Sequence, residues 1–398
     1  SSGPPLQVDT SSVWSRKVAA LPCGALTTAG GAANVSSVGQ VFHACRLLFE
    51  LEKTMAGRFQ WIVMWSLLLP CGVLAGSGWA AHPNRVVWEG EQGPGKGKHI
   101  VFIAGDHEYR GEESLPALAR IMARHYGFKC SFFVTTDPTD GTIKPGSNHI
   151  TGLEALKTAD LMVLFTRFQA FGDEQMQHIE DYLATGKPVM GLRTTTHGFQ
   201  GLKGRFAKYN DGYKGPEKEW QAGFGEAILG EHWVGHYGRN HRQSSRLQLE
   251  KTQAKHPILR GVKDVHTQCG GYNAHPRKGS IVLARGQILN GMKFDDPPDT
   301  TKDVLPVCWI RHYRRDNPRS RVFATTHGAS EDILNEGFRR MLVNAHLWCL
   351  GMDDAIAADN EVSFVGPYNP VTFNFGGYRK GIKPADIEGF DTPILGKR

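Results

Sequence analysis

The feature that most constrains the fold is an alternation of short apolar runs with amphipathic helical patterns from His99 onward. Uninterrupted apolar runs are typical of strands that are buried on both faces, as in a parallel sheet covered by helices. The alternation therefore predicts an α/β fold: an open, doubly wound, mostly parallel sheet with helices on both faces.

Apolar runs mark the expected strands, and apolar residues at spacings of three and four mark the expected helices. The expected strands are 99–105, 130–135, 160–165, 188–192, 245–249, 281–289, 306–313 and 321–325. The expected helices are 112–126, a short one at 153–157, 173–184 and 335–350. Between 193 and 242 the regular pattern stops and Gly, His and aromatic residues dominate, which predicts a large excursion from the sheet.

The N-terminal part of the chain has a targeting pattern. Arg58 precedes an apolar run at 61–69, and small residues lead to Ala80 and Ala81. We interpret residues 55–81 as a signal peptide cleaved after one of these alanines, which predicts export to the periplasm or the cell exterior. A retained anchor is the alternative, but the run is about half the length that a membrane-spanning helix needs, so we expect no stable membrane span.

The same patterns divide the rest of the chain. Residues 1–54 lie upstream of the signal and are interpreted as an extension outside the fold, from an over-extended start site. Residues 85–360 are expected to form one domain. Residues 361–398 have many Gly and Pro and no helical period, which predicts an extended C-terminal tail.

Charge and cysteine content exclude some function classes. A formal net charge of +7 over 398 residues is too small to indicate a nucleic-acid partner unless it gathers on one face. The basic run 311–321 spans two strands and the turn between them, so we interpret it as a solvated hairpin. The four cysteines after the signal lack CxxC spacing. Cys130 and Cys308 lie in apolar runs and Cys349 lies near the end of an apolar-faced helix, so we expect buried free thiols at Cys130, Cys269, Cys308 and Cys349.

Three polar clusters follow expected strands directly. They are 105–113, 193–198 and 325–331, and they carry His107, His197 and His327. Because ligands bind beyond the carboxyl ends of parallel strands, we expect these imidazoles to meet around one hollow and to transfer protons or hold a metal. The alternative is that the clusters only cap helices and turns.

A transition metal is a further alternative. His232, His236 and His241 have spacings that allow metal ligation, but no Glu follows His232, and Gly235 and Gly238 disfavour a firm helix. No nucleophile elbow occurs at the end of the strand before residue 193, which disfavours covalent acyl transfer there. The sequence specifies neither a cofactor nor an oligomeric state.

Taken together, these motifs resemble the ThuA-like, or trehalose utilisation, family over roughly residues 85–380. The segments that carry the resemblance are 105–113, 191–197, 229–236, 256–261, 306–309, 321–326 and 339–344. It implies a class I glutamine amidotransferase-like, flavodoxin-like sheet without the amidotransferase cysteine, and a role in disaccharide catabolism. The family's common pattern has an acidic residue at the position of His107, so an acidic role is not carried over there.

The leading hypothesis is an exported protein that processes a disaccharide or keto-sugar by acid–base chemistry. We expect catalytic roles for His107, Glu108, His197 and His327, and substrate binding by Arg110, Arg193 and His236. Glu108 and His197 would be the proton-transfer pair, and the arginines would hold sugar oxygens. The alternatives are a non-catalytic carbohydrate-binding protein that uses Trp220, Trp233 and Tyr237, and a metal-dependent hydrolase.

Overall fold

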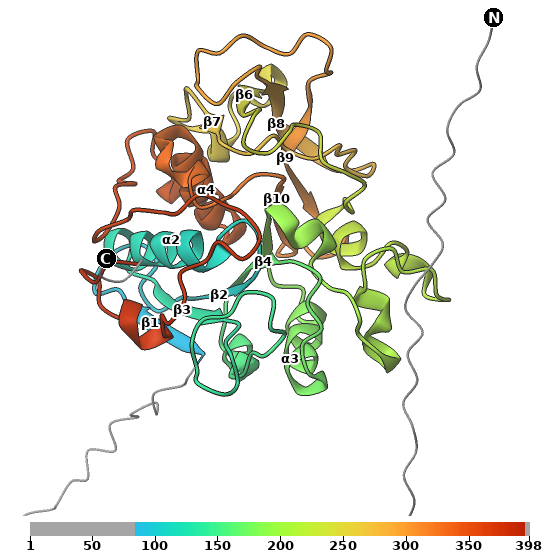
Figure 1. The fold of residues 1–398 in the computed structure, drawn as a ribbon, viewed down its shortest axis with the longest axis vertical. Coiled ribbons are helices and arrows are strands. Elements are labelled where there is room, and N and C mark those ends of the chain that lie inside the picture. Colours follow the sequence, from blue (N-terminus) through green and yellow to red (C-terminus); the bar gives the residue numbers. More distant parts are fainter. Residues whose placement is uncertain (1–83, 395–398) are drawn as a thin grey trace, which may run out of the picture. The chain divides into compact units, whose positions relative to one another are not determined.

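The computed structural model describes residues 84–394, and the segments interpreted as signal peptide and N-terminal extension lie outside these residues. Within the described part, ten strands form one sheet in the order β1-β3-β2-β4-β5-β10-β9-β8-β6-β7 (Figure 1). The strands are β1 Arg85–Glu89, β2 His99–Gly105, β3 Lys129–Val134, β4 Leu161–Thr166, β5 Val189–Leu192, β6 Ser245–Leu249, β7 His266–Thr267, β8 Ile281–Ile288, β9 Leu305–His312 and β10 Arg321–Thr325.

The sheet is mixed, which corrects the expectation of a mostly parallel one. Strands β3, β2, β4, β5 and β10 pair in parallel, whereas the other five pairings are antiparallel. The chain between β6 and β10 contains no α-helix. Parallel neighbours are usually joined by a crossover helix, whereas antiparallel neighbours need none, so these strands pair antiparallel. The strands expected from the apolar runs are confirmed within one or two residues, while β1 and the two-residue β7 were not predicted.

Three α-helices pack on this sheet, at the places that the sequence predicts. They are α2 Gly111–Tyr126, α3 Asp173–Ala184 and α4 Glu336–Cys349. Helix α2 ends at Gly127, which has a φ of 79°, and α4 begins where the side chain of Asn335 accepts a bond from the amide of Phe338 at 2.9 Å. In the described part of the chain, we find no helix with the length and apolarity that crossing a bilayer demands.

The remaining helical segments are short. They are η1 Leu153–Lys157, η2 Arg193–His197, η3 Gly204–Tyr209, η4 Lys218–Trp220, η5 Gly225–Leu229, η6 Lys251–Gln253, η7 Pro257–Leu259, η8 Asp332–Leu334, η9 Asp353–Ala355 and η10 Pro384–Ile387. Four of them lie in the excursion between β5 and β6, which contains no strand.

Apolar side chains form one core on each face of the sheet. Helices α2 and α4 pack on one face, and α3, η1 and the excursion pack on the other (Figure 1). Residues 361–394 contain only η10 and lie on the α2 and α4 face, where Tyr368, Phe373 and Ile387 join the core. All four described cysteines are buried and free, as the sequence predicts.

Candidate functional site

The loops after β2, β5 and β10 lie together at the carboxyl ends of the parallel strands. The hydroxyl of Thr194 donates to Asp106 at 2.7 Å, and the amide of Arg193 donates to the carbonyl of His327 at 3.2 Å. The segment after β4 joins them, because the amide of Phe168 donates to the carbonyl of His197 at 2.9 Å. Four loops that are distant in sequence therefore build this edge of the sheet.

A carboxylate, a guanidinium and an imidazole form the first part of the site. Nη2 of Arg167 lies 3.4 Å from Oε2 of the buried Glu108, and Nη1 of Arg167 lies 3.0 Å from Nε2 of His107. Arginine can only donate, so Nε2 of His107 accepts and its proton is on Nδ1. Nδ1 of His107 can therefore donate a hydrogen bond, and it has no acceptor among the described residues.

The excursion contributes the second part. Tyr109 places its hydroxyl 2.9 Å from Nε2 of His236. The amide of Asn240 donates to this hydroxyl at 2.8 Å and to Oε1 of Glu108 at 3.3 Å. Asn240 therefore ties the excursion to the loop after β2.

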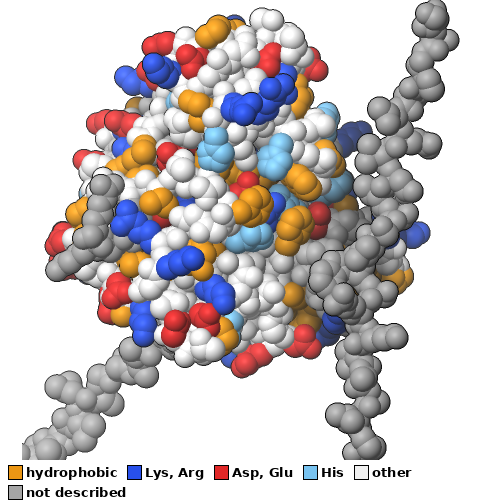
Figure 2. All heavy atoms as spheres, viewed as in Figure 1, with side chains coloured by type: hydrophobic (Ala, Val, Ile, Leu, Met, Phe, Trp, Pro, Cys, Tyr) orange, Lys and Arg blue, Asp and Glu red, His pale blue; other side chains and the backbone are white. Residues whose placement is uncertain are grey.

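Aromatic rings complete the site. The buried ring of His197 lies 4.8 Å from that of Phe168 and 5.0 Å from that of Trp233, and Trp233 lies 5.7 Å from His236. The exposed Phe375 lies 5.5 Å from His107. Histidine side chains gather near the centre of one face of the molecule, beside hydrophobic ones (Figure 2).

These contacts form a closed ring, which we call the candidate site. Its members are His107, Glu108, Tyr109, Arg167, Phe168, His197, Trp233, His236, Asn240 and Phe375.

Several buried polar atoms of the candidate site have no hydrogen-bond partner among the described residues. They are Nδ1 of His107, Oε2 of Glu108, Nε of Arg167, Nε1 of Trp233 and Oδ1 of Asn240. Buried polar groups in proteins are nearly always bonded. Donors and acceptors gathered at one place therefore suit a ligand rich in hydroxyl groups.

The site shifts the pKa values of its acid and bases in opposite directions. Burial raises the pKa of Glu108, and the adjacent Arg167 opposes this rise. Burial lowers the pKa of His107 and, together with nearby guanidinium groups, that of His197. The pKa of His236 falls to about 4 for the same reasons. Near neutral pH the site therefore combines neutral imidazoles with a carboxyl group that holds its proton more readily than usual.

The two arginines expected to bind substrate have different places. Arg193 is buried behind the candidate site, between the rings of Tyr109 at 4.2 Å and Tyr272 at 4.1 Å. Arg110 is not on the ring, since it contacts the carbonyl of Asn374 at 3.2 Å and Glu112 at 3.4 Å.

Sequence reasoning missed Arg167 as well as Tyr109, Asn240 and Phe375. The signal for Arg167 was present, because it comes directly after the strand β4 and thus obeys the rule that found the other loops.

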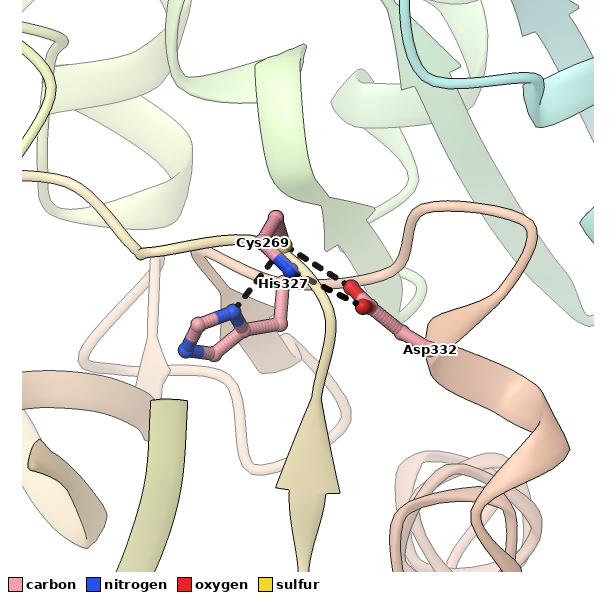
Figure 3. A group of neighbouring side chains, drawn as sticks. All are labelled: Cys269, His327 and Asp332. Atoms are coloured by element: carbon pink, nitrogen blue, oxygen red, sulfur yellow. Dashed lines mark hydrogen bonds between the residues drawn. The ribbon is translucent and has the colours of Figure 1, made fainter. Parts of the chain in front are cut away.

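His327 does not join the candidate site. It is fully buried, and its Nδ1 lies 3.2 Å from the sulfur of Cys269, which donates to Asp332 at 2.9 Å (Figure 3). The expected meeting of three imidazoles therefore holds for His107 and His197 but is wrong for His327. The reason is that its side chain turns toward the antiparallel half of the sheet, against the segment after β7.

Cys269, His327 and Asp332 are the one group of metal-ligand type that the described residues bring within 4.8 Å. The carboxylate of Asp332, however, already accepts bonds from the amides of Gln268, Cys269, Gly328 and Ala329 and from the thiol. Burial also raises the pKa of Cys269 well above its ordinary value, so the thiol is not a ready anionic ligand. These residues fit a structural network better than a metal centre.

The three histidines with spacings that allow metal ligation, His232, His236 and His241, also have separate partners. His232 pairs with Glu226 at 3.5 Å, His236 contacts Tyr109, and the ring of His241 stacks on Phe373 at 4.4 Å. Among the aromatic residues expected to stack on a sugar, Trp233 alone is part of the ring of contacts, whereas Trp220 packs on Tyr209 and Tyr237 on Lys302.

Comparison with known proteins gives a family match. The family model "ThuA: Trehalose utilisation" matches residues 98–349. No match was found among curated proteins. Among solved structures, a ThuA-like protein from Parabacteroides merdae is 15% identical, with a TM-score of 0.36, and the match covers 70% of this chain and 98% of that one.

Two other solved structures also match this chain. The mmIFT52 N-terminal domain is 12% identical with a TM-score of 0.36, covering 63% of this chain and 97% of that one. An exo-beta-1,4-mannosidase, Op5Man5, from Opitutaceae bacterium strain TAV5 is 10% identical with a TM-score of 0.29, covering 64% and 36%.

Proposed function

Because this chain belongs to the ThuA, or trehalose utilisation, family, we propose that it is an exported enzyme that processes a disaccharide or keto-sugar by acid–base chemistry. Family membership supports the carbohydrate-related role. The observation that carries the chemistry is the candidate site, where Glu108 and neutral imidazoles lie among buried, unpartnered polar atoms.

The lining of the candidate site suits a sugar. Hydroxyl groups both donate and accept, so they match the unpartnered Nδ1 of His107, Nε1 of Trp233 and Oδ1 of Asn240. The rings of Trp233 and Phe168 offer apolar surface to the C–H faces of a pyranose.

Glu108 and His197 are the proposed proton-transfer pair. The hydroxyl of Thr196 lies 3.3 Å from Nδ1 of His197, and a proton on this nitrogen leaves Nε2 free to accept one. His197 removes a proton from the carbon beside a sugar carbonyl, and the protonated Glu108 gives its proton to the carbonyl oxygen, which yields an enediol. Arg167 stabilises negative charge that develops on this oxygen.

The order of the parallel strands extends the proposal to the fold. The five parallel strands follow one another across the sheet as second, first, third, fourth and fifth in chain order. This order supports a flavodoxin-like, doubly wound core. Strand β5 leads into Arg193, so a Ser or Cys nucleophile is missing from that turn.

Solvent exchange tests the proton transfer directly. In D₂O, we expect the protein to replace the C–H protons beside the carbonyl of a keto-disaccharide with deuterium, and NMR measures the rate of this exchange. Glu108→Gln and His197→Asn should each reduce turnover about 10²-fold or more. Glu154→Gln, which changes an exposed carboxylate on η1, is the control and should retain full activity. Undiminished exchange in both site variants would overturn the proposal.

A non-catalytic carbohydrate-binding protein is the second candidate, which the placement of Trp233 beside His197 favours. In that case calorimetry would detect sugar binding by a protein that shows no turnover. Trp233→Ala would abolish this binding, whereas Glu108→Gln would leave it unchanged.

A further inference from the structure

A cavity lies at the opposite end of the sheet. Its volume is about 620 Å³, and it lies where α3 ends and the chain leaves β9. Because β9 runs antiparallel to β10, with His312 opposite Arg321, this place is at the amino ends of the parallel strands. The cavity is therefore separate from the candidate site, which lies at their carboxyl ends.

The cavity is strongly basic. Five cationic and two acidic side chains line it: Lys208, Arg277, Arg311, Arg314, Arg315, Glu180 and Glu219. Glu180 is already neutralised, since it lies 2.7 Å from Lys208 and 3.5 Å from Arg205. Glu226 likewise pairs with Arg277 at 3.6 Å. Arg311, Arg314 and Arg315 form no ion pair among the described residues and outnumber Glu219, so this part of the cavity attracts anions.

The arginines are held in place by backbone carbonyls. Nη1 of Arg311 donates to Ala227 at 3.0 Å and to Ile228 at 2.9 Å, and Nη1 of Arg314 donates to Ala184 at 2.6 Å. These bonds orient each guanidinium but use only one of its nitrogens. Among the described residues, Nε and Nη2 of Arg311 and the whole guanidinium of Arg315 have no acceptor.

Mutual repulsion shows that the cations crowd together. Burial, together with the charges of Arg277 and Arg315, lowers the pKa of Arg311 to about 10, and Glu226 opposes this fall. Arg311 and Arg315 also line an adjoining cavity of about 440 Å³ together with Lys278. A bound anion would relieve this repulsion at several guanidinium groups at once.

The wall of the cavity indicates the rest of the ligand. The rings of Trp220, Tyr209 and Tyr313 line it beside the arginines, and the rings of Trp220 and Tyr209 lie 4.6 Å apart. The volume is far larger than a lone oxyanion needs and is typical of a site for a small organic molecule.

We propose that this cavity binds a small organic ester of phosphate or sulfate, with the tetrahedral oxyanion held by Arg311, Arg314 and Arg315 and the organic part against Trp220. Phosphate and sulfate esters share the chemistry that these arginines recognise, namely several oxygens within reach of planar donors. The proposal is independent of the reaction at the candidate site.

Titration calorimetry with phenyl phosphate, phenyl sulfate and phenol tests it. We expect at least one ester to bind and phenol to bind at least tenfold more weakly. Whichever ester binds more tightly identifies the natural oxyanion. Arg315→Ala should weaken ester binding about tenfold or more, and so should Arg314→Ala. Both side chains are exposed, so the variants should fold.

Two controls make the result specific. Arg319→Ala removes the same charge from the same hairpin but lies outside the cavity, and it should leave the affinity unchanged. Glu108→Gln should also bind the ester normally, which separates this outcome from the fate of the proposed function. Equal binding of phenol, or equal effects of Arg315→Ala and Arg319→Ala, would overturn the proposal.

Discussion

At the scale of single residues, the environments of Glu108 and His197 predict a pH profile. Burial raises the pKa of Glu108 and lowers that of His197. The acid therefore keeps its proton to a higher pH than an ordinary glutamic acid, and the base stays free of protons to a lower pH than an ordinary histidine. We expect kcat/KM to fall at high pH as Glu108 loses its proton and at low pH as His197 gains one.

The variant Glu108→Gln assigns the high-pH limb. Its residual activity should no longer decline at high pH, because glutamine does not titrate there, while the low-pH limb should remain. Steady-state kinetics of both proteins between pH 4 and 10 provide the measurement. An unchanged high-pH limb in the variant would show that another group is the acid.

Asp332 supports a second prediction at this scale. Its buried carboxylate accepts four backbone amides and the thiol of Cys269, and each buried donor left unpaired costs about 1–3 kcal/mol. We expect Asp332→Ala to lower the free energy of unfolding by about 3 kcal/mol or more, and Cys269→Ala by only about 1 kcal/mol, as measured by urea denaturation.

The same experiment decides between a structural network and a metal centre. Added Zn²⁺ or EDTA should leave the unfolding midpoint of the unchanged protein where it is, because the ligand atoms of Asp332 are already used. If Zn²⁺ raised the midpoint of this protein but not that of Cys269→Ala, the cluster would be a metal site.

Residue types and strand ends were enough to predict that His107, Glu108 and His197 lie at one edge. They could not predict side-chain direction. His327 follows the end of β10 and His197 the end of β5, yet the ring of His327 turns toward Cys269 in the segment after β7. Asn240 was beyond prediction because its contact with Glu108 spans an irregular excursion.

At the scale of elements, the start of α2 predicts how stability depends on pH. Burial raises the pKa of Glu112 to about 7 and that of Glu113 to about 8. The folded protein thus binds protons that the unfolded chain, with an ordinary pKa of 4.5, releases. Stability from this source is complete below about pH 4.5 and is lost as the pH rises through these raised values.

Glu113→Gln should flatten this dependence. The glutamine oxygen can still accept the amide of Val371, which Glu113 does at 3.0 Å, but it carries no charge to bury. Each unit of pKa shift corresponds to about 1.4 kcal/mol, so the variant should be more stable than the parent at pH 8.5 and similar at pH 5. Urea denaturation at both pH values provides the measurement, and Glu154→Gln, which alters an exposed carboxylate, should reproduce the parent's slope.

Apolar runs predicted the elements well but not their direction. Strand β9 is buried along most of its length, just as the parallel β4 is, because elements cover both faces of the sheet at these two strands. A run that is apolar on both faces carries no signal of whether its neighbour is parallel. The short β7 and the alternating β1 lacked the continuous run altogether.

At the scale of the whole molecule, the C-terminal segment connects the candidate site to the rest of the fold. The hydroxyl of Ser330 donates to the carbonyl of Val371 at 2.9 Å, and that of Thr372 donates to Glu331 at 2.7 Å. These bonds attach the segment to the loop after β10, while the amide of Val371 attaches it to Glu113 on α2. No periodic pattern marks the segment, so its part in the site could not be predicted from the sequence.

Two phenylalanines of this segment have separable roles. Phe373 is fully buried, with its ring 5.0 Å from that of Tyr109 and 4.4 Å from that of His241. Phe375 is 60% exposed and lies over Arg167 at 4.7 Å. Phe373→Ala should therefore lower the free energy of unfolding by about 3–5 kcal/mol, whereas Phe375→Ala should change it by less than about 0.5 kcal/mol.

The two substitutions should affect ligand affinity in the opposite order, with the larger effect from Phe375→Ala. Phe375 borders the candidate site beside His107, so its removal takes away apolar surface that a bound sugar covers, and we expect KM to rise several-fold. Phe373 lies beneath Tyr109, so any loss of activity in Phe373→Ala should parallel its loss of folded protein. Urea denaturation and steady-state kinetics on both variants separate the two effects. A stable Phe375→Ala protein with unchanged KM would show that the exposed ring of this segment does not contact the substrate.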